Sequence, residues 1–266
     1  MASETVKIKQ KDFCLEKAIS HIKKVLNQSD DFDHVDHLPD LNNLTYSNGV
    51  YVSNTAFFID IRDSSKHVKS NDIKVNARLY RAYISEIIMI LRSHPCCKEI
   101  NIVGDCVSAI FIEEKELSKK YSGDKSDVIE ALQSASMIIP TVGIINKLFK
   151  NKYDNYTPIK VGIGVATGRS LVIKTGESGS GISKPVFIGD NVNLAAHLCD
   201  TAHKNNFPEI LVNDDVKKNC TKCEVGIENE KFSEWLTIQE TVDDVPCYGG
   251  YFFRVSIQKK LDELNK

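Results

Sequence analysis

Two short acidic turns contain the side chains of this sequence that are best suited to chemistry. Asp60 follows the apolar run 55–59, and Asp105 follows the segment 99–103. Both segments are predicted strands, so each acid stands where a strand ends. Two carboxylates that converge on one site can hold a pair of divalent cations, which bind and polarise a nucleoside triphosphate. Either turn alone is an ordinary place for Asp. Together, the two turns favour a metal site.

The elements around the two turns predict a sheet with helices between its strands. We expect a strand over 51–61, a helix from about 71 to 92, and a hairpin formed by 99–103 and 107–112, with Asp105 in its turn. Such alternation within one compact unit is typical of an α+β fold, with a mixed sheet and helices mainly on one face.

The second half of the chain predicts a helix over 128–149, which Pro140 is expected to kink or interrupt. A second hairpin of 158–167 and 169–173 is expected to turn at Gly168. The remaining predicted elements are a charged loop over 115–127, a Gly/Ser loop over 175–183, a strand over 186–188, a helix over 190–204, strands over 209–212 and 250–256, and a charged, weakly helical tail over 257–266.

The composition excludes several function classes. The net charge is −2 and the pI is near 6.4, so a nucleic-acid groove or an anionic membrane surface is not indicated. No apolar run approaches the roughly 18 to 20 residues that span a bilayer. The first residues lack the apolar region of a signal peptide. We therefore expect a cytoplasmic protein without membrane insertion, whose eight cysteines are reduced.

Two further segments contain residue types that bind metals. Cys220 and Cys223 have the spacing of half a zinc knuckle, and Cys247 could join them, but a second pair at suitable spacing is missing. The acidic segment 30–37 is better explained as a solvated loop. Neither segment is therefore our preferred metal site.

The glycine-rich segments do not match the common nucleotide-binding motifs. The glycines at 162, 164 and 168 have the wrong spacing for a dinucleotide fingerprint, and a predicted strand follows them where that fingerprint needs a helix. The loop 176–181 lacks the Gly-Lys-Ser/Thr of a P-loop.

Four motifs taken together are more specific. They are Phe58-Ile-Asp60-Ile61-Arg-Asp-Ser-Ser65, Gly104-Asp105, Val161-Gly-Ile-Gly164 with Gly168, and Ile188-Gly-Asp-Asn-Val-Asn193-Leu-Ala-Ala. In this order, on these predicted elements, they resemble the catalytic domain of class III nucleotidyl cyclases. The resemblance covers roughly residues 50–256. It leaves 1–49 as an N-terminal helix (5–28) with a polar loop, and 257–266 as a charged tail.

The resemblance implies a ferredoxin-like βαββαβ core that works as a head-to-tail homodimer with shared active sites. Asp60 and Asp105 match the residues that bind two divalent cations, Mn²⁺ or Mg²⁺, and Ile61 matches a backbone carbonyl ligand. Asn193 matches the asparagine of the partner subunit that orients the ribose. The positions expected to bind the phosphates are the backbone amides of Arg62, Asp63, Ser64 and Ser65 with the Ser65 hydroxyl, and Phe58 opens the same substrate-binding motif.

The sequence departs from this family where the base and the transition state are bound. A lysine that helps to select adenine is replaced by Asn101, and its acidic partner by Val186. An apolar residue leaves a purine amino group without a partner, which disfavours adenine. The transition-state arginine is replaced by His197, which could donate a hydrogen bond to phosphate or could equally be a surface histidine. Lys174 stands where many relatives have glycine and could reach the triphosphate.

With these departures, and with Leu171-Val-Ile-Lys-Thr-Gly176 followed by Gly-Ser-Gly-Ile182, the chain resembles a bacterial subset, the pyrimidine cyclases of Pycsar antiphage defence, which make cyclic UMP or cyclic CMP for a separate effector. Our leading hypothesis is a homodimeric, Mn²⁺- or Mg²⁺-dependent pyrimidine nucleotidyl cyclase, with UTP favoured over CTP. One alternative is an adenylate cyclase with an atypical base pocket. Another is a degenerate cyclase that binds nucleotide or dimerises as a regulatory module.

Overall fold

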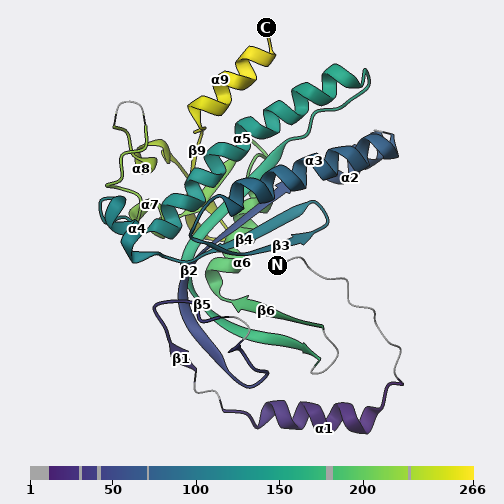
Figure 1. Cartoon of the computed structure of the whole chain (residues 1–266), viewed down its shortest axis with the longest axis vertical. Coiled ribbons are helices and arrows are strands. Elements are labelled where there is room, and N and C mark those ends of the chain that lie inside the picture. Colours follow the sequence, from purple (N-terminus) through teal and green to yellow (C-terminus); the bar gives the residue numbers. More distant parts are fainter. Residues whose placement is uncertain (1–11, 30–31, 41–42, 71, 178–181, 227–228) are drawn as a thin grey trace. The chain divides into compact units, whose positions relative to one another are not determined.

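The computed structural model of the chain describes residues 12–29, 32–40, 43–70, 72–177, 182–226 and 229–266 (Figure 1). The chain forms two compact units. The smaller unit contains residues 1–52 and 169–189, and the larger unit contains residues 53–168 and 190–266.

The larger unit is built on a sheet with the strand order β3-β4-β2-β5-β7-β9-β8. Its first four strands follow the path β2-α3-β3-β4-α5-β5 and lie in the order β3-β4-β2-β5, which is the arrangement of a ferredoxin-like βαββαβ core. The sheet is mixed, because β5 pairs with β7 in parallel while β2 and β4 are antiparallel. The predicted α+β fold is confirmed. The strands are β2 (Gly49–Ile61), β3 (Cys97–Val103), β4 (Cys106–Phe111), β5 (Val161–Glu177), β7 (Ile210–Asn213), β8 (Ile238–Val242) and β9 (Val245–Gly250).

Two long helices, α3 (Ile73–Arg92) and α5 (Ser126–Lys152), lie against each other and against β3 and β4 (Figure 1). They share one hydrophobic core with the strands, to which α3 contributes Leu79 and Ile87, α5 contributes Leu132, and β2 contributes Phe57 and Ile59. Their apolar faces pack into this core. The shorter helices are α2 (Ser64–Ser70), α4 (Lys115–Lys120), α6 (Asp190–Thr201), α7 (Asp214–Lys218), α8 (Phe232–Trp235) and α9 (Val255–Leu264).

Helix α6 packs against β5 on the other face of the sheet. A Cβ at Gly164 would lie 2.1 Å from the Ala195 carbonyl oxygen, and one at Gly162 would lie 2.6 Å from the Ala202 carbonyl oxygen. The neighbouring residues of β5 point to the main core, because successive side chains of a strand alternate between its faces. The two glycines that do not fit a dinucleotide fingerprint therefore let the backbone of α6 approach the sheet.

Helix α5 continues through Pro140, so the prediction of an interruption there is wrong. Proline has no N–H and leaves the carbonyl four residues earlier, that of Ser136, without its helical donor. The backbone N–H of Arg254 donates to this Ser136 oxygen at 2.7 Å, which explains why the helix tolerates the proline. By length and composition α5 could cross a membrane, but 67% of its most apolar window is buried inside the protein, a pattern that core helices share.

Three other predictions of local structure are wrong. Strand β5 continues from Val161 to Glu177, so the chain does not turn at Gly168, whose backbone is not in the left-handed region. The predicted last strand over 250–256 is replaced by the earlier hairpin β8–β9, whose turn is formed by Asp243 and Asp244 with φ of 49° and 61°. The loop over 115–127 contains α4.

The smaller unit contains α1 (Leu15–Leu26), β1 (Asp33–His34), the first residues of β2, the last part of β5, and β6 (Ile182–Ile188). Strand β1 pairs in parallel with the start of β2, and β6 forms an antiparallel hairpin with β5. The acidic segment expected to be a loop is thus partly a strand. The predicted N-terminal helix is found over a shorter range, and the start of its predicted range and the tip of the Gly/Ser loop lie outside the described residues.

Candidate functional site

The strand register of the larger unit brings the two acidic turns together. Ile59 of β2 pairs with Val107 of β4, and the β3–β4 hairpin closes with Val103 opposite Cys106. Asp60, the last residue but one of β2, therefore lies beside the turn that carries Asp105. Gly104, which precedes Asp105, has φ of 65°, a left-handed conformation that glycine adopts without steric cost.

The two carboxyl groups interact strongly. Burial, a hydrogen bond to Asp105 and the negative charge of Asp105 raise the pKa of Asp60 to about 6, against the opposing charge of Arg62. The Asp105 Oδ2 atom is buried and has no hydrogen-bond partner. Two adjacent carboxyls, one with an orphaned oxygen, form a donor set that suits hard divalent cations such as Mg²⁺ or Mn²⁺. The residues present therefore fit the cations implied by the sequence.

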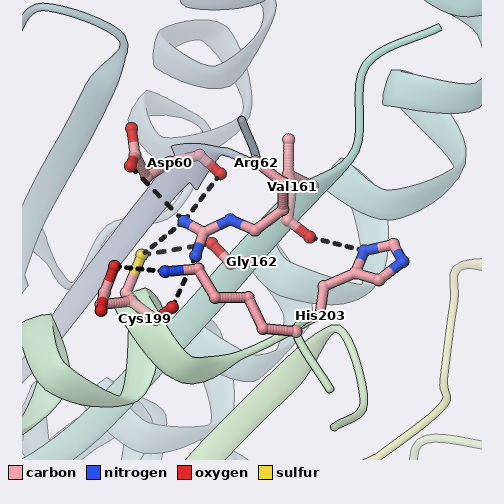
Figure 2. Close-up of polar contacts among 8 residues, drawn as sticks. Asp60, Arg62, Val161, Gly162, Cys199 and His203 are labelled. Atoms are coloured by element: carbon pink, nitrogen blue, oxygen red, sulfur yellow. Dashed lines mark hydrogen bonds and ion pairs between the residues drawn. The ribbon is translucent and has the colours of Figure 1, made fainter. Parts of the chain in front are cut away.

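The Arg62 side chain holds this region to α6, as Figure 2 shows. Its guanidinium donates to the backbone oxygen of Asp200 at 2.8 Å and to the backbone and side-chain oxygens of Asp60 at 3.3 and 3.4 Å. Its Nη2 atom also lies 4.0 Å from the Cys199 sulfur. The Arg62 side chain is 6% exposed. A buried charge in this position is stabilised by these oxygens and fixes the end of β2 relative to α6.

A cleft of about 260 Å³ opens at this place. One wall is the continuous segment of residues 60–66, and Asp200 and Lys204 contribute from the end of α6 and the loop after it. The cleft thus combines Asp60 of the acid pair with the predicted phosphate-binding turn. This arrangement can hold a charged, phosphate-containing ligand beside the acid pair.

The predicted phosphate-binding turn is a tight backbone turn that leads into α2. Asp63 has φ of 54°, and its carbonyl oxygen accepts from the N–H groups of Lys66 and His67. Helix α2 begins at Ser64, where backbone N–H groups point out of the helix. The Arg62 N–H already donates to the Lys160 carbonyl at 2.7 Å, so it has an acceptor within the protein, and its role as a phosphate donor stays a prediction.

Asn193 and His197 lie one turn apart on the same exposed face of α6. The His197 Nδ1 atom forms a hydrogen bond with Asp243 Oδ2 in the β8–β9 turn. Neither residue is among the described residues that line the cleft. Their exposure leaves both side chains accessible to a ligand.

The other predicted substrate-binding residues fall in both units. In the larger unit, Phe58 of β2 and Asn101 of β3 both pair with Ser108 of β4. In the smaller unit, Lys174 lies 5.7 Å from the ring centre of Tyr46, and Val186 pairs with Ile173. The roles of Phe58, Asn101, Lys174 and Val186 in substrate binding remain predictions.

Three features near the acid pair and the cleft have no signal in the sequence. Tyr83 of α3 is fully buried, and its hydroxyl has no hydrogen-bond partner; burial, then the charges of Asp60, Cys199 and Asp105, raise the pKa of this phenol well above 10. The Arg62 guanidinium and Lys204 are the other two. No spacing rule would have identified them, because their positions depend on how α3 and α6 pack against the sheet.

The cysteines give no sign of a second metal site. All eight are free, as predicted. Cys220, Cys223 and Cys247 are buried, and burial raises the pKa of Cys220 to about 12, which keeps this thiol protonated near neutral pH. Among the described residues, no group of three or more His, Cys, Asp or Glu side chains could hold a metal ion. The Asp60–Asp105 pair has two side chains, so it is not a group of this size.

Comparison with known proteins gives consistent results. No protein-family profile matches the chain. The chain is 42% identical over 258 residues to a uridylate cyclase of Gulbenkiania mobilis, a match covering 95% of this chain and 97% of that protein. It is 34% identical to a uridylate cyclase of Treponema porcinum, over 77% of this chain and 68% of that one.

Solved structures support the same fold. The guanylyl cyclase Cya2 matches with a TM-score of 0.60 and 14% identity, over 77% of this chain and 95% of that chain. The adenylyl cyclase CyaB from P. aeruginosa matches with a TM-score of 0.57 and 18% identity, over 77% and 97%. Both neighbours are named as nucleotide cyclases, and the match shows that this chain shares their fold, as predicted from the four motifs.

Proposed function

Because the chain belongs to the uridylate cyclase family, we propose that it converts UTP to 3′,5′-cyclic UMP and pyrophosphate. The observation that carries this proposal is the pairing of Asp60 with Asp105, where Asp60 lines a cleft together with the predicted phosphate-binding turn. In the reaction, the ribose 3′-hydroxyl loses a proton and attacks the α-phosphorus, which expels pyrophosphate. The protein has to position the reacting groups and to balance charge.

Asp60, Asp105 and the Ile61 carbonyl would hold two divalent cations, Mn²⁺ or Mg²⁺, which supply positive charge that acidifies the 3′-hydroxyl and neutralises the phosphates. The protein keeps this donor set ready in two ways. Arg62 opposes the rise in the pKa of Asp60, so the carboxyl is ionised at neutral pH. The hairpin turn at Gly104 fixes Asp105 beside it.

The backbone amides of Asp63, Ser64 and Ser65, with the Ser65 hydroxyl, are proposed to receive the β- and γ-phosphates. A helix start is a suitable place for an anion, because its first N–H groups lack acceptors within the helix. The location of these residues in the wall of the cleft supports this role.

We propose that Asn193 and His197 act across a head-to-tail homodimer, on the nucleotide whose phosphates are held by the partner. Asn193 would orient the ribose, and His197, when both ring nitrogens are protonated, would donate a hydrogen bond to phosphate from Nε2. Two observations support this arrangement: both side chains are exposed on one face of α6, and the described residues of the cleft do not include them. The Nδ1 hydrogen bond to Asp243 leaves Nε2 to face the substrate.

Base selection is proposed to depend on Asn101 and Val186. The Asn101 amide can donate and accept hydrogen bonds and so can serve uracil or cytosine. Val186 offers no partner for a purine amino group, which disfavours ATP. The relatives are named uridylate cyclases, which favours UTP over CTP as the substrate. The resemblance to antiphage pyrimidine cyclases further suggests a cytoplasmic second-messenger synthase with a separate effector.

The test is to incubate the purified protein and Mn²⁺ with each of the four nucleoside triphosphates, and to identify cyclic products by mass spectrometry. We expect cyclic UMP as the main product. Cyclic CMP as the main product would keep the reaction and correct the base. Cyclic AMP alone would identify an adenylate cyclase with an atypical pocket. No product from any triphosphate would point to a nucleotide-binding module and refute the proposal.

A further inference from the structure

We propose that Lys204, in the loop after α6, is a ligand of the substrate triphosphate in the cleft beside Asp60. This inference rests on the proposed function and adds a residue to the phosphate-binding site. The four motifs end before this loop, so they give Lys204 no role. Its assignment comes from where the fold places it.

The cleft has two walls, and Lys204 is the basic residue that the second wall contributes. Residues 60–66 form the first wall, which includes the phosphate-binding turn and Lys66. Asp200 and Lys204 form the second. A triphosphate bound between the walls would therefore meet a lysine from each side.

The backbone around Lys204 is firmly placed. His203, Asn205 and Asn206 all have positive φ, at 59°, 48° and 71°, which is an uncommon conformation for residues with a side chain. Two contacts hold the loop in place. The Phe207 N–H donates to the Lys204 carbonyl at 2.8 Å. The His203 Nδ1 atom lies 2.9 Å from the Val161 carbonyl (Figure 2). The loop therefore presents Lys204 from a defined position.

Arg62 connects the two walls but cannot itself bind the phosphates. Its Nη1 donates to the Asp200 carbonyl, and its Nη2 donates to Asp60. The Arg62 side chain is buried. Arg62 is thus a positioning residue, which holds the helix end that leads to Lys204 against the end of β2.

Lys66 and Lys204 are the lysines of the cleft that can move. Each is held by an exposed aspartate: Lys66 by Asp63 at 2.8 Å, and Lys204 by Asp200 at 2.7 Å. The Asp200 side chain is 78% exposed, and an ion pair in such a setting contributes little to stability. A triphosphate carries more negative charge than a carboxylate. Lys204 can therefore exchange Asp200 for a phosphate at small cost.

The experiment compares Lys204→Gln and Asp200→Asn with the wild-type protein. Both variants lose the same ion pair. If Lys204 binds phosphate, Lys204→Gln should raise KM for UTP about tenfold or more, because a charged hydrogen bond to substrate is lost. Asp200→Asn should give an equal or lower KM, because the lysine loses its competing carboxylate. Lys204→Arg should restore most of the binding.

The matched control is Lys218→Gln. Lys218 is also an exposed lysine paired with an aspartate four residues earlier, Asp214 on α7, and it does not line the cleft. This variant should behave like the wild type. Equal effects of Lys204→Gln and Asp200→Asn would indicate a merely structural ion pair and would overturn the proposal.

A second measurement separates this inference from the proposed function. Inorganic tripolyphosphate with Mn²⁺ should bind the wild-type protein in calorimetry, and Lys204→Gln should weaken that binding about tenfold. If the wild-type protein makes no cyclic nucleotide but this difference is present, the proposed function fails and the phosphate ligand stands. Cyclic UMP formation with unchanged KM and unchanged tripolyphosphate binding in Lys204→Gln would refute the role of Lys204 alone. Absence of tripolyphosphate binding to the wild type would also refute it.

Discussion

Two acidic sites of the larger unit have similarly raised pKa values but differ in kind: one is a candidate functional site and the other is structural. Burial and Asp105 raise the pKa of Asp60 to about 6, and burial raises the pKa of Asp127, in the first turn of α5, to about 6 as well. Each place also has a buried carboxyl oxygen without a partner, Oδ2 of Asp105 and Oδ1 of Asp127. Neither property therefore distinguishes a functional site from a structural one.

The surroundings make the distinction. Asp60 has a second carboxyl beside it and lines a cleft. Asp127 is 2% exposed, and its other oxygen accepts the Thr55 hydroxyl at 2.7 Å. A ligand can thus reach the first acid but not the second. The comparison shows that a second acid and an opening, more than a perturbed pKa, indicate a site for a cation-bound ligand.

The largest expected effect is on activity at the open acid pair. Asp60→Asn and Asp105→Asn should each raise the activation barrier by at least about 3 kcal/mol, because a charged metal ligand is lost. This would reduce the rate of cyclic UMP formation by a factor of roughly 150. Folding at pH 7.5 should be unaffected or improved, since each variant removes the repulsion between the two carboxyls. Activity and thermal unfolding are measured on the same preparations. Near-normal activity in either variant would contradict the assignment.

The Asp60→Asn variant also tests whether each active site is shared between two subunits. Mixing Asp60→Asn protein with Asn193→Ala protein gives heterodimers in which one site contains both changes and the other contains neither. After free exchange of subunits, about a quarter of the wild-type activity should return. Lack of rescue after confirmed exchange would contradict the head-to-tail arrangement.

An effect of intermediate size, on stability alone, is expected at the buried Asp127. The folded pKa of Asp127, about 6, lies above the ordinary value of 3.8. Between these values the folded protein keeps a proton that the unfolded chain has lost, so the contribution of Asp127 to stability falls as the pH rises from about 4 to 6, and is constant above. Asp127→Asn removes this cost. It should raise the free energy of unfolding by about 1 to 3 kcal/mol at pH 7.5 and by less at pH 4.5.

Urea unfolding at the two pH values measures this difference, and the contributions of other groups cancel between the wild type and the variant. Cyclase activity of Asp127→Asn should stay within a few-fold of the wild type. A loss of activity as large as that of Asp60→Asn would show that Asp127 belongs to the catalytic machinery. The two acidic sites would then no longer differ in kind.

The smallest effect is expected at an exposed acid that is neither in the cleft nor in the core. Asp243 bonds to His197, and both side chains are more than half exposed. Asp243→Asn should lower kcat by a few-fold through a less well-oriented imidazole and should leave stability unchanged within about 0.5 kcal/mol. The control is Asp244→Asn, in the same turn with a similar backbone. If His197→Ala already has normal activity, or if both Asn variants behave alike, the pair has no role.

The parts of the fold that could be predicted are those with a strong local pattern. The strand ending at Asp60, the β3–β4 hairpin, and the helix that carries Asn193 are found close to the expected positions. Gly168 was misleading, because its small size serves close packing: a Cβ there would lie 2.8 Å from the Cβ of Asn191. A local pattern cannot distinguish a glycine that allows a turn from one that allows close contact.

The sequence by itself determined which residue types stand at the strand ends and in what order the four motifs occur, and these were sufficient to predict the fold and the kind of chemistry. Only the tertiary structure decided which of these residues meet. The pairing of Ile59 with Val107 puts Asp60 beside Asp105, and the packing of α6 on the sheet brings Arg62 and Lys204 to the same cleft. The reason is that local propensity acts over a few residues, whereas strand register and helix packing are fixed by contacts between segments far apart in the chain.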